Sequence, residues 1–396
     1  MDGGFDSLFK AGLDHATAGR WREAEEAFVA ASRFRQTVNL LVNLAQARRE
    51  LGAFASAAAL LDVAVVNRPA DLVLRSRLAS LHILTGRDDR AEQVLMAALE
   101  IDPHDAWARF ILSTLCLHQG RFAEGWPLYE ARMEVAPETC RPPPNVCRPE
   151  WAGEPLTGRA ILVWAEQGIG DQILFARFIS RLKALGARQV TVVCHPRLAT
   201  LFRGLSGADL VLPLQSQMPL PPHDVWIRMG SAPLHICATP ADLPYPPYLP
   251  IPERRPEWDP GAAGKARIGL IWRGNPNNPV DRQRSLPWDQ AERLFAAGAV
   301  SLHPEETGAR DFSDTAALIG GLDLVISVDT SVAHLAGALG GPCWVLLPVM
   351  GTDWRWPRPG AADLDWYPGT RTFRQRQVGD WTRVIDEVLA ELRALD

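Results

Sequence analysis

Lysine is nearly missing from this chain of 396 residues, which has 41 basic residues but only three lysines, Lys10, Lys183 and Lys265. A site for an anion must therefore be built from arginine guanidinium groups, backbone N–H groups or helix ends. Acidic residues number 46, and the net charge of −5 gives no reason to expect binding to nucleic acid or to an anionic membrane.

Paired cysteines and long apolar runs are also missing. The six cysteines include no C-x-x-C pair, which disfavours a structural zinc site and favours a reduced cytoplasmic protein. No apolar stretch approaches the roughly 18 residues that span a membrane. The start, MDGGFDSLFKAG, lacks the basic and apolar regions of a secretory signal. We therefore expect a cytoplasmic protein without a transmembrane segment.

The first third of the chain repeats. Gly19, Gly52, Gly86 and Gly120 are spaced by 33, 34 and 34 residues. Five positions after each glycine comes a small residue and nine positions after it a large one: Ala24 and Phe28, Ala57 and Leu61, Ala91 and Leu95, Gly125 and Tyr129. A glycine can end a helix in a left-handed turn, and a small residue lets the next helix approach closely.

This spacing resembles the tetratricopeptide repeat, which is a pair of helices with a period of 34 residues. It predicts an α-solenoid of about four repeats over residues 1–137, although Gly12 stands where a packing residue is usual. The alternative is a helical bundle with accidental spacing. Solenoids of this kind usually present a concave face to a peptide, so a protein or peptide partner is expected, with a plain structural cap as the alternative.

A proline-rich linker, 138–158, precedes a change to short apolar runs typical of buried parallel strands. The predicted strands are 160–164, 190–194, 209–212 and 224–227 in a first half, 159–258, and 267–272, 299–302, 323–327 and 343–347 in a second half, 265–396. Helical patterns lie between them, and residues 380–395 predict a closing helix. The fold class is therefore α plus α/β, with two Rossmann-like halves and a cleft between them.

A glycine-rich turn follows the first strand, in the sequence WAEQGIGDQILFARF of residues 164–178. Gly168 and Gly170 allow close approach to the backbone. Asp171 begins the next helix, where it could act as a general base or simply cap the helix. Glu166 has the same ambiguity. No Gly-Lys-Ser/Thr follows, so this is not a P-loop.

Two further loops follow strands of the second half. Arg273, Asn275 and Arg284 lie after the first of these strands, where arginine groups suit a diphosphate, or where a loop is merely solvated. Asp329, Thr330, Ser331 and His334 lie at the helix start after residues 323–327. That helix start offers N–H groups to a diphosphate; the alternative is ordinary capping with a packed histidine.

Trp354 and Arg355 follow the last predicted strand and could line a base or sugar site, or could form a packed aromatic lid. No D-x-D pair lies near a predicted strand end and no cluster of histidines and cysteines occurs. The sequence thus predicts a diphosphate site without a metal.

These strings, in this order, resemble the glycosyltransferase-B enzymes of the bacterial heptosyltransferase-like group (glycosyltransferase family 9-like), especially the branch fused to tetratricopeptide repeats. The resemblance implies metal-independent, inverting transfer from a nucleotide sugar, without a cofactor, to a protein, peptide or glycan positioned by the repeats. It gives Asp171 the role of base. It puts the donor's phosphates at Asp329, Thr330, Ser331 and His334, with Arg273 or Arg284 in place of the group's usual lysine.

One segment departs from that pattern. Residues 301–311 read SLHPEETGARD, which is shorter than the strand and turn usual near the nucleotide base. The identity of the donor stays open for this reason. A repeat scaffold with a degenerate, non-catalytic transferase domain is the alternative function.

Overall fold

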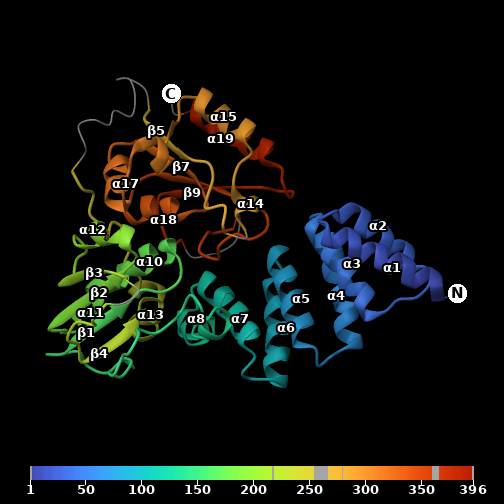
Figure 1. Ribbon diagram of the computed structural model, residues 1–396, viewed down its shortest axis with the longest axis horizontal. Helices are drawn as coiled ribbons and strands as arrows, with labels where there is room; N and C mark the ends of the chain where they lie inside the picture. The colour runs from blue at the N-terminus through green and yellow to red at the C-terminus, as the bar shows by residue number, and fades with distance from the viewer. Residues whose placement is uncertain (1, 216–217, 254–265, 279, 359–364, 395–396) are drawn as a thin grey trace. The chain divides into compact units, whose positions relative to one another are not determined.

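The computed structural model describes residues 2–215, 218–253, 266–278, 280–358 and 365–394 (Figure 1). The chain divides into two compact units, Met1–Cys116 and Leu117–Asp396. The predicted repeat array, 1–137, crosses this division, and the predicted domain limits stay predictions.

The first unit consists of helices that pack in consecutive pairs, α1 with α2, α3 with α4 and α5 with α6. They are α1 (Asp2–Thr17), α2 (Trp21–Ser32), α3 (Val38–Glu50), α4 (Phe54–Asn67), α5 (Leu72–Leu84) and α6 (Asp88–Ile101), followed by α7 (Ala106–His118), which continues into the second unit. Helical repeats that resemble tetratricopeptide repeats are thus confirmed.

The repeated residues have the predicted roles. Gly19, Gly52 and Gly86 have φ angles of 71°, 81° and 69°, the left-handed conformation that ends the first helix of each pair. The small and large positions are buried in all three pairs. Gly12 is explained by its neighbour, because a Cβ atom there would lie 2.4 Å from Cε1 of Phe28.

The second unit contains two sheets whose strands are all parallel. In the first, β1 (Ala160–Trp164), β2 (Gln189–Cys194), β3 (Leu210–Pro213) and β4 (Val225–Arg228) lie in the order β3-β2-β1-β4. In the second, β5 (Ile268–Ile271), β6 (Val300–Ser301), β7 (Leu324–Val328), β8 (Cys343–Leu347) and β9 (Thr370–Arg374) lie in the order β6-β5-β7-β8-β9. The eight predicted strands are confirmed; β9 was not predicted.

Helices precede, connect and follow these strands. Before the first sheet come α8 (Phe122–Tyr129) and α9 (Arg132–Val135). The first half has α10 (Ile169–Phe175), α11 (Ile179–Ala184), α12 (Ala199–Phe202), α13 (Ala232–Ile236) and the 3-10 helices η1 (Ala176–Phe178), η2 (Pro196–Leu198), η3 (Met229–Ser231) and η4 (Pro240–Asp242). The second has α14 (Asp281–Arg284), α15 (Trp288–Ala296), α16 (Pro304–Thr307), α17 (Phe312–Ile319), α18 (Ser331–Ala338) and the closing helix α19 (Trp381–Arg393), which packs on α15 and β9.

The predicted linker is partly built into the first sheet. Glu150 forms a parallel bridge with Trp226 of β4, and the N–H of Trp151 donates to the carbonyl of Trp226 over 2.7 Å. The segment before β1 therefore lies along the outer edge of β4.

Strand order reverses between β1 and β4 in one sheet and between β5 and β7 in the other. In open parallel sheets a ligand binds beyond the carboxyl ends of the strands at such a reversal. The loops at these positions include residues 165–168 after β1, 272–275 after β5 and 329–330 after β7. The fold thus puts three of the four predicted motifs where a ligand would be expected.

Candidate functional site

Asp171 lies in the first turn of α10 and does two things at once. Its Oδ2 accepts a hydrogen bond from the N–H of Gly168 over 2.9 Å, which caps the helix as the alternative interpretation predicted. Its Oδ1 lies 2.7 Å from Nη2 of Arg355 in the second half. Burial raises the pKa of Asp171, and the charge of Arg355 opposes that rise. The side chain keeps 23% of its surface exposed, so a substrate hydroxyl could still reach it.

Arg355 links the two halves of the unit. Only 3% of its side chain is exposed, and its Nη1 lies 2.7 Å from Oδ2 of Asp353 while Nη2 contacts Asp171. The guanidinium carbon lies 4.5 Å from the centre of the Trp354 ring and 5.5 Å from that of Phe175. The arginine predicted to line a sugar or base site therefore holds the acidic group of the first half.

Asp329 points into the protein. Its carboxylate accepts hydrogen bonds from the indole N–H of Trp356 (2.8 Å) and from the backbone N–H of Asp353 (3.2 Å). Burial raises the pKa of Asp329 to about 6, and the nearby charge of Asp353 adds to this rise. The Asp329 side chain thus organises the loop at residues 353–356, next to the site.

The start of α18 is arranged as predicted for a capped helix. Thr330 Oγ1 accepts a hydrogen bond from the N–H of Val332 over 3.3 Å, and Ser331 is half-buried. Nη1 of Arg284 donates to the carbonyl of Asp329 over 2.6 Å, while its Nε donates to Asp281 over 3.1 Å. The structure therefore brings the guanidinium of Arg284 next to the N-terminus of α18.

His334 is a packed histidine. The ring is stacked on Trp356 with centroids 4.9 Å apart, and Nδ1 lies 3.1 Å from the hydroxyl of Tyr367. Burial lowers the pKa of His334 to about 3, so the ring is neutral at ordinary pH. A Cβ atom on Gly170 would lie 2.8 Å from Cδ2 of His334, so α10 and α18 pack closely against each other.

The remaining predicted residues make other contacts. Arg273 pairs with Glu305 and lies over the ring of Trp272. Asn275 is exposed, and its side-chain oxygen accepts the N–H of Asn277 over 3.0 Å, which is a local turn. Trp354 packs edge-on against Trp366 with centroids 5.4 Å apart, as a packed aromatic lid would.

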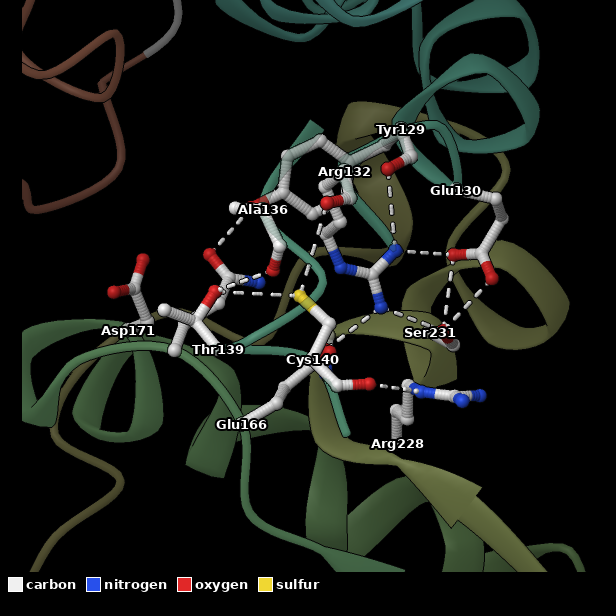
Figure 2. Close-up of polar contacts among 12 residues, drawn as sticks. Tyr129, Glu130, Arg132, Ala136, Thr139, Cys140, Glu166, Asp171, Arg228 and Ser231 are labelled. Atoms are coloured by element: carbon white, nitrogen blue, oxygen red, sulfur yellow. Dashed lines mark hydrogen bonds and ion pairs between the residues drawn. The ribbon is translucent and has the colours of Figure 1, made fainter. Parts of the chain in front are cut away.

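Sequence reasoning missed a second buried polar cluster, around Arg132 (Figure 2). Arg132 of α9 pairs with Glu166 in the loop after β1, over 2.7 Å, and with Glu130, over 2.5 Å. Glu166 was noted as a candidate carboxylate, but Arg132 follows a segment with the spacing of a fourth repeat and was assigned to the array. The sequence carries no signal that pairs these two residues.

The described ranges contain no group of three or more His, Cys, Asp or Glu side chains arranged to hold a metal ion. In the same ranges, no helix combines the length and the apolar character that a membrane crossing requires.

No family model matches the chain. It is 26% identical over 341 residues to protein FlbA of Caulobacter vibrioides, a similarity that covers 74% of this chain and 56% of FlbA. The chain therefore spans about half of the length of that curated relative.

Solved structures of repeat proteins are similar to about a third of the chain. A tetratricopeptide repeat protein from Parabacteroides merdae is 20% identical and covers 34% of this chain and 54% of its own, with a TM-score of 0.32. MamA is 16% identical; the similarity covers 34% of this chain and 79% of the MamA chain, with a TM-score of 0.32. YrrB, described as a TPR protein with an unusual peptide-binding site, is 19% identical, with coverages of 34% and 70% and a TM-score of 0.32. These similarities assign no activity to the chain.

Proposed function

We propose that the second unit is a metal-independent, inverting glycosyltransferase of the glycosyltransferase-B type, which moves a sugar from a nucleotide sugar to a protein, peptide or glycan. One observation carries the proposal. The loop at the strand-order reversal of the first sheet meets the loop after β8 of the second sheet, so that Asp171 of one half lies 2.7 Å from Arg355 of the other. A partly exposed carboxylate then lies beside a helix start that suits a diphosphate.

In this reaction Asp171 removes the proton from the acceptor hydroxyl. The oxygen attacks the anomeric carbon of the donor, and the bond to the nucleoside diphosphate breaks with its electron pair on the leaving phosphate. The N–H groups at the start of α18 and the guanidinium of Arg284 stabilise the charge that grows there. Arg355 opposes the rise in the pKa of Asp171 and orients its carboxylate, because Nη2 of Arg355 bonds to Oδ1 while the N–H of Gly168 bonds to Oδ2.

The acceptor class follows from the repeats. Helical repeats commonly bind extended peptides, so the first unit of this chain would recruit a protein or peptide that carries the hydroxyl. A glycan on such a protein is an equally suitable nucleophile. The repeats supply affinity for the acceptor and take no part in the chemistry.

A repeat scaffold without catalysis is the second candidate, and a specific observation favours it. Asp329, His334 and Arg355 are all buried, and each already has partners within its own unit. These contacts leave fewer polar groups of the second half to hold a donor. The chain would then bind partners through its repeats and turn over no nucleotide sugar.

The test is release of nucleoside diphosphate from a panel of nucleotide sugars, together with the variant Asp171→Asn. We expect the parent to release diphosphate and the variant to lose about 10²–10⁴-fold in turnover while keeping its nucleotide affinity in calorimetry, because a positioned base contributes about that much.

The matched control is Asp242→Asn, which alters a similar capping carboxylate: Asp242 accepts the N–H of Thr239 over 2.8 Å at the start of η4. Equal losses in the two variants would mean that capping, and not proton removal, is what Asp171 provides. A parent that releases nothing from any donor would favour the scaffold.

A further inference from the structure

The side chain of Arg132 is almost completely buried, and its two Nη groups contact four different residues (Figure 2). Nη2 donates to Glu166 Oε1 and to the hydroxyl of Ser231, each over 2.7 Å. Nη1 donates to the carbonyl of Tyr129 over 3.2 Å and contacts Glu130. The side chains of Arg132 and Glu166 are only 3% and 1% exposed. The planar guanidinium of arginine can donate to several acceptors at once, whereas the ammonium group of lysine cannot reproduce this geometry.

This cluster occupies the point where strand order reverses in the first sheet. Glu166 follows β1, and Ser231 lies in η3, directly after β4. Glu166 Oε1 also accepts the N–H of Gly230 over 2.8 Å, and a Cβ atom on that glycine would lie 2.4 Å from the same oxygen. Arg132 of α9 and its partner Glu166 therefore lie at this reversal, next to the ends of β1 and β4.

The next residue of the loop is held from the same side. Gln167 has a φ of 58°, a left-handed conformation that is uncommon outside glycine and asparagine. Its N–H donates to the carbonyl of Thr139 over 2.8 Å, and its side-chain oxygen accepts the hydroxyl of Tyr129 over 3.1 Å. Residues 129–139 thus hold Glu166 through its side chain and Gln167 through both its backbone and its side chain, just before the turn that carries Asp171.

We propose that Arg132 is a positioning residue for Asp171: it holds Glu166, and through the loop after β1 it fixes the turn from Gly168 to Asp171. This rests on the proposed function for the catalytic role of Asp171. The mechanical link itself does not, because the hydrogen bond from Gly168 to Asp171 exists whether or not a sugar is transferred. On this view α8 and α9 belong functionally to the α/β unit, because their residues position the loop after β1.

Two kinds of variant separate this role from mere stabilisation. Removing one partner of a buried ion pair leaves an unpaired buried charge. The double variant Arg132→Gln/Glu166→Gln removes both charges and keeps amide groups that can bond to the N–H of Gly230 and the hydroxyl of Ser231, so it is expected to fold. Arg132→Lys keeps the charge but loses the fork. The control is Arg228→Lys, because Arg228 is a neighbouring arginine that bonds instead to Glu150 (2.6 Å) and to the carbonyl of Cys140 (3.0 Å).

The measurements are hydrogen exchange of the full-length chain and the steady-state kinetics of sugar transfer. We expect exchange at residues 166–172 to rise about tenfold or more in Arg132→Lys and in the double variant, with β1 and β4 unchanged and with no rise in Arg228→Lys. The value of kcat should fall while KM for the nucleotide sugar stays near that of the parent, because the donor site lies in the other half.

The proposal fails if the folded variants exchange like the parent, if Arg228→Lys loosens the turn equally, or if exchange rises while kcat is unchanged. A parent without any turnover defeats the proposed function instead. The exchange comparison then decides alone whether Arg132 holds the turn.

Discussion

Gly170 tests whether the two α/β halves are in contact in solution. It lies in the first turn of α10, and a Cβ atom there would lie 2.8 Å from Cδ2 and 3.4 Å from Nε2 of His334 on α18. A Cβ atom that lies less than 3.0 Å from another heavy atom requires one of the two groups to shift. The ring cannot move easily, because it is stacked on Trp356 at 4.9 Å and contacts Tyr367. Gly170→Ala should therefore force the two helices apart.

The magnitude follows from two opposing effects. Overpacking a rigid site costs about 1–3 kcal/mol, and the immobile ring puts this site at about 2–3 kcal/mol. Replacing a glycine by alanine within a helix gains about 0.5–1 kcal/mol. The net loss in the free energy of unfolding is thus about 1–2.5 kcal/mol, which corresponds to a fall in Tm of about 2–4 °C for the second unit, Leu117–Asp396.

Differential scanning calorimetry of the full chain measures this fall. Gly341→Ala is the matched control, since its Cβ atom would meet only the carbonyl of Ala336, at 3.9 Å, and a change within about 0.5 kcal/mol is expected. In the double variant Gly170→Ala/His334→Ala the clash is relieved, so the two changes should be non-additive by about 0.5–3 kcal/mol. If Gly170→Ala is as stable as the parent and simply additive with His334→Ala, α10 and α18 lie apart and the reasoning on the site is refuted.

Two further predictions concern stability. Because burial lowers the pKa of His334 to about 3, the unfolded chain binds an extra proton at this residue below about pH 6.5, and the contribution of His334 to stability should fall by up to about 1.4 kcal/mol per pH unit as the pH drops from there. Asp329, with its pKa raised to about 6, acts in the opposite direction and largely cancels this change between about pH 6 and pH 4. His334→Ala keeps that carboxyl, so in urea unfolding the stability of the parent relative to the variant should fall as the pH drops below about 6.5, and a constant difference would contradict the assignment. In the repeats, Gly12→Ala should lower the Tm of the first unit, because the new Cβ atom would lie 2.4 Å from Cε1 of Phe28. The control Gly3→Ala should be neutral or stabilising, because nothing lies within 4 Å of its Cβ position. If Gly3→Ala lowers the Tm more than Gly12→Ala does, Phe28 is not packed against α1.

The regular elements could be predicted because their signals are local. Continuous apolar runs such as 160–164 are typical of strands covered on both faces, and the structure buries all of β1. The missed strand, β9, lies at the edge of its sheet, where only Phe373 among its five residues is buried. Its sequence, TRTFR, alternates with charged residues and could not be told from a loop.

The candidate site was predicted as separate residues and not as an arrangement. Asp171 and Arg355 were each identified from their position after a strand, but their ion pair depends on how two sheets pack, which no local pattern encodes. The same holds for His334. Its position one turn into α18 is compatible with binding a phosphate or with packing in the core. In the structure the ring packs against the aromatic rings of Trp356 and Tyr367.

The segment after the fourth glycine, Gly120, keeps the repeat pattern but packs against the α/β unit. Gly120 has the expected φ of 75°, and Gly125 lies close to Leu117, so the local geometry of a repeat is kept. Tyr129, at the position of Phe28 and Leu61, packs instead against Phe175 of α10 (6.2 Å) and Trp354 (6.0 Å).

The neighbouring Trp126 lies 6.2 Å from Trp366 and 6.3 Å from Phe175, so α8 covers aromatic rings from both halves of the α/β unit. These rings would be exposed to water if the chain were cut after residue 137, and exposing large aromatic side chains costs several kcal/mol. Helix α8 is therefore packed as part of the second compact unit, which begins at Leu117. Glu150 and Trp151 of the predicted linker belong to the same unit, where they pair along β4.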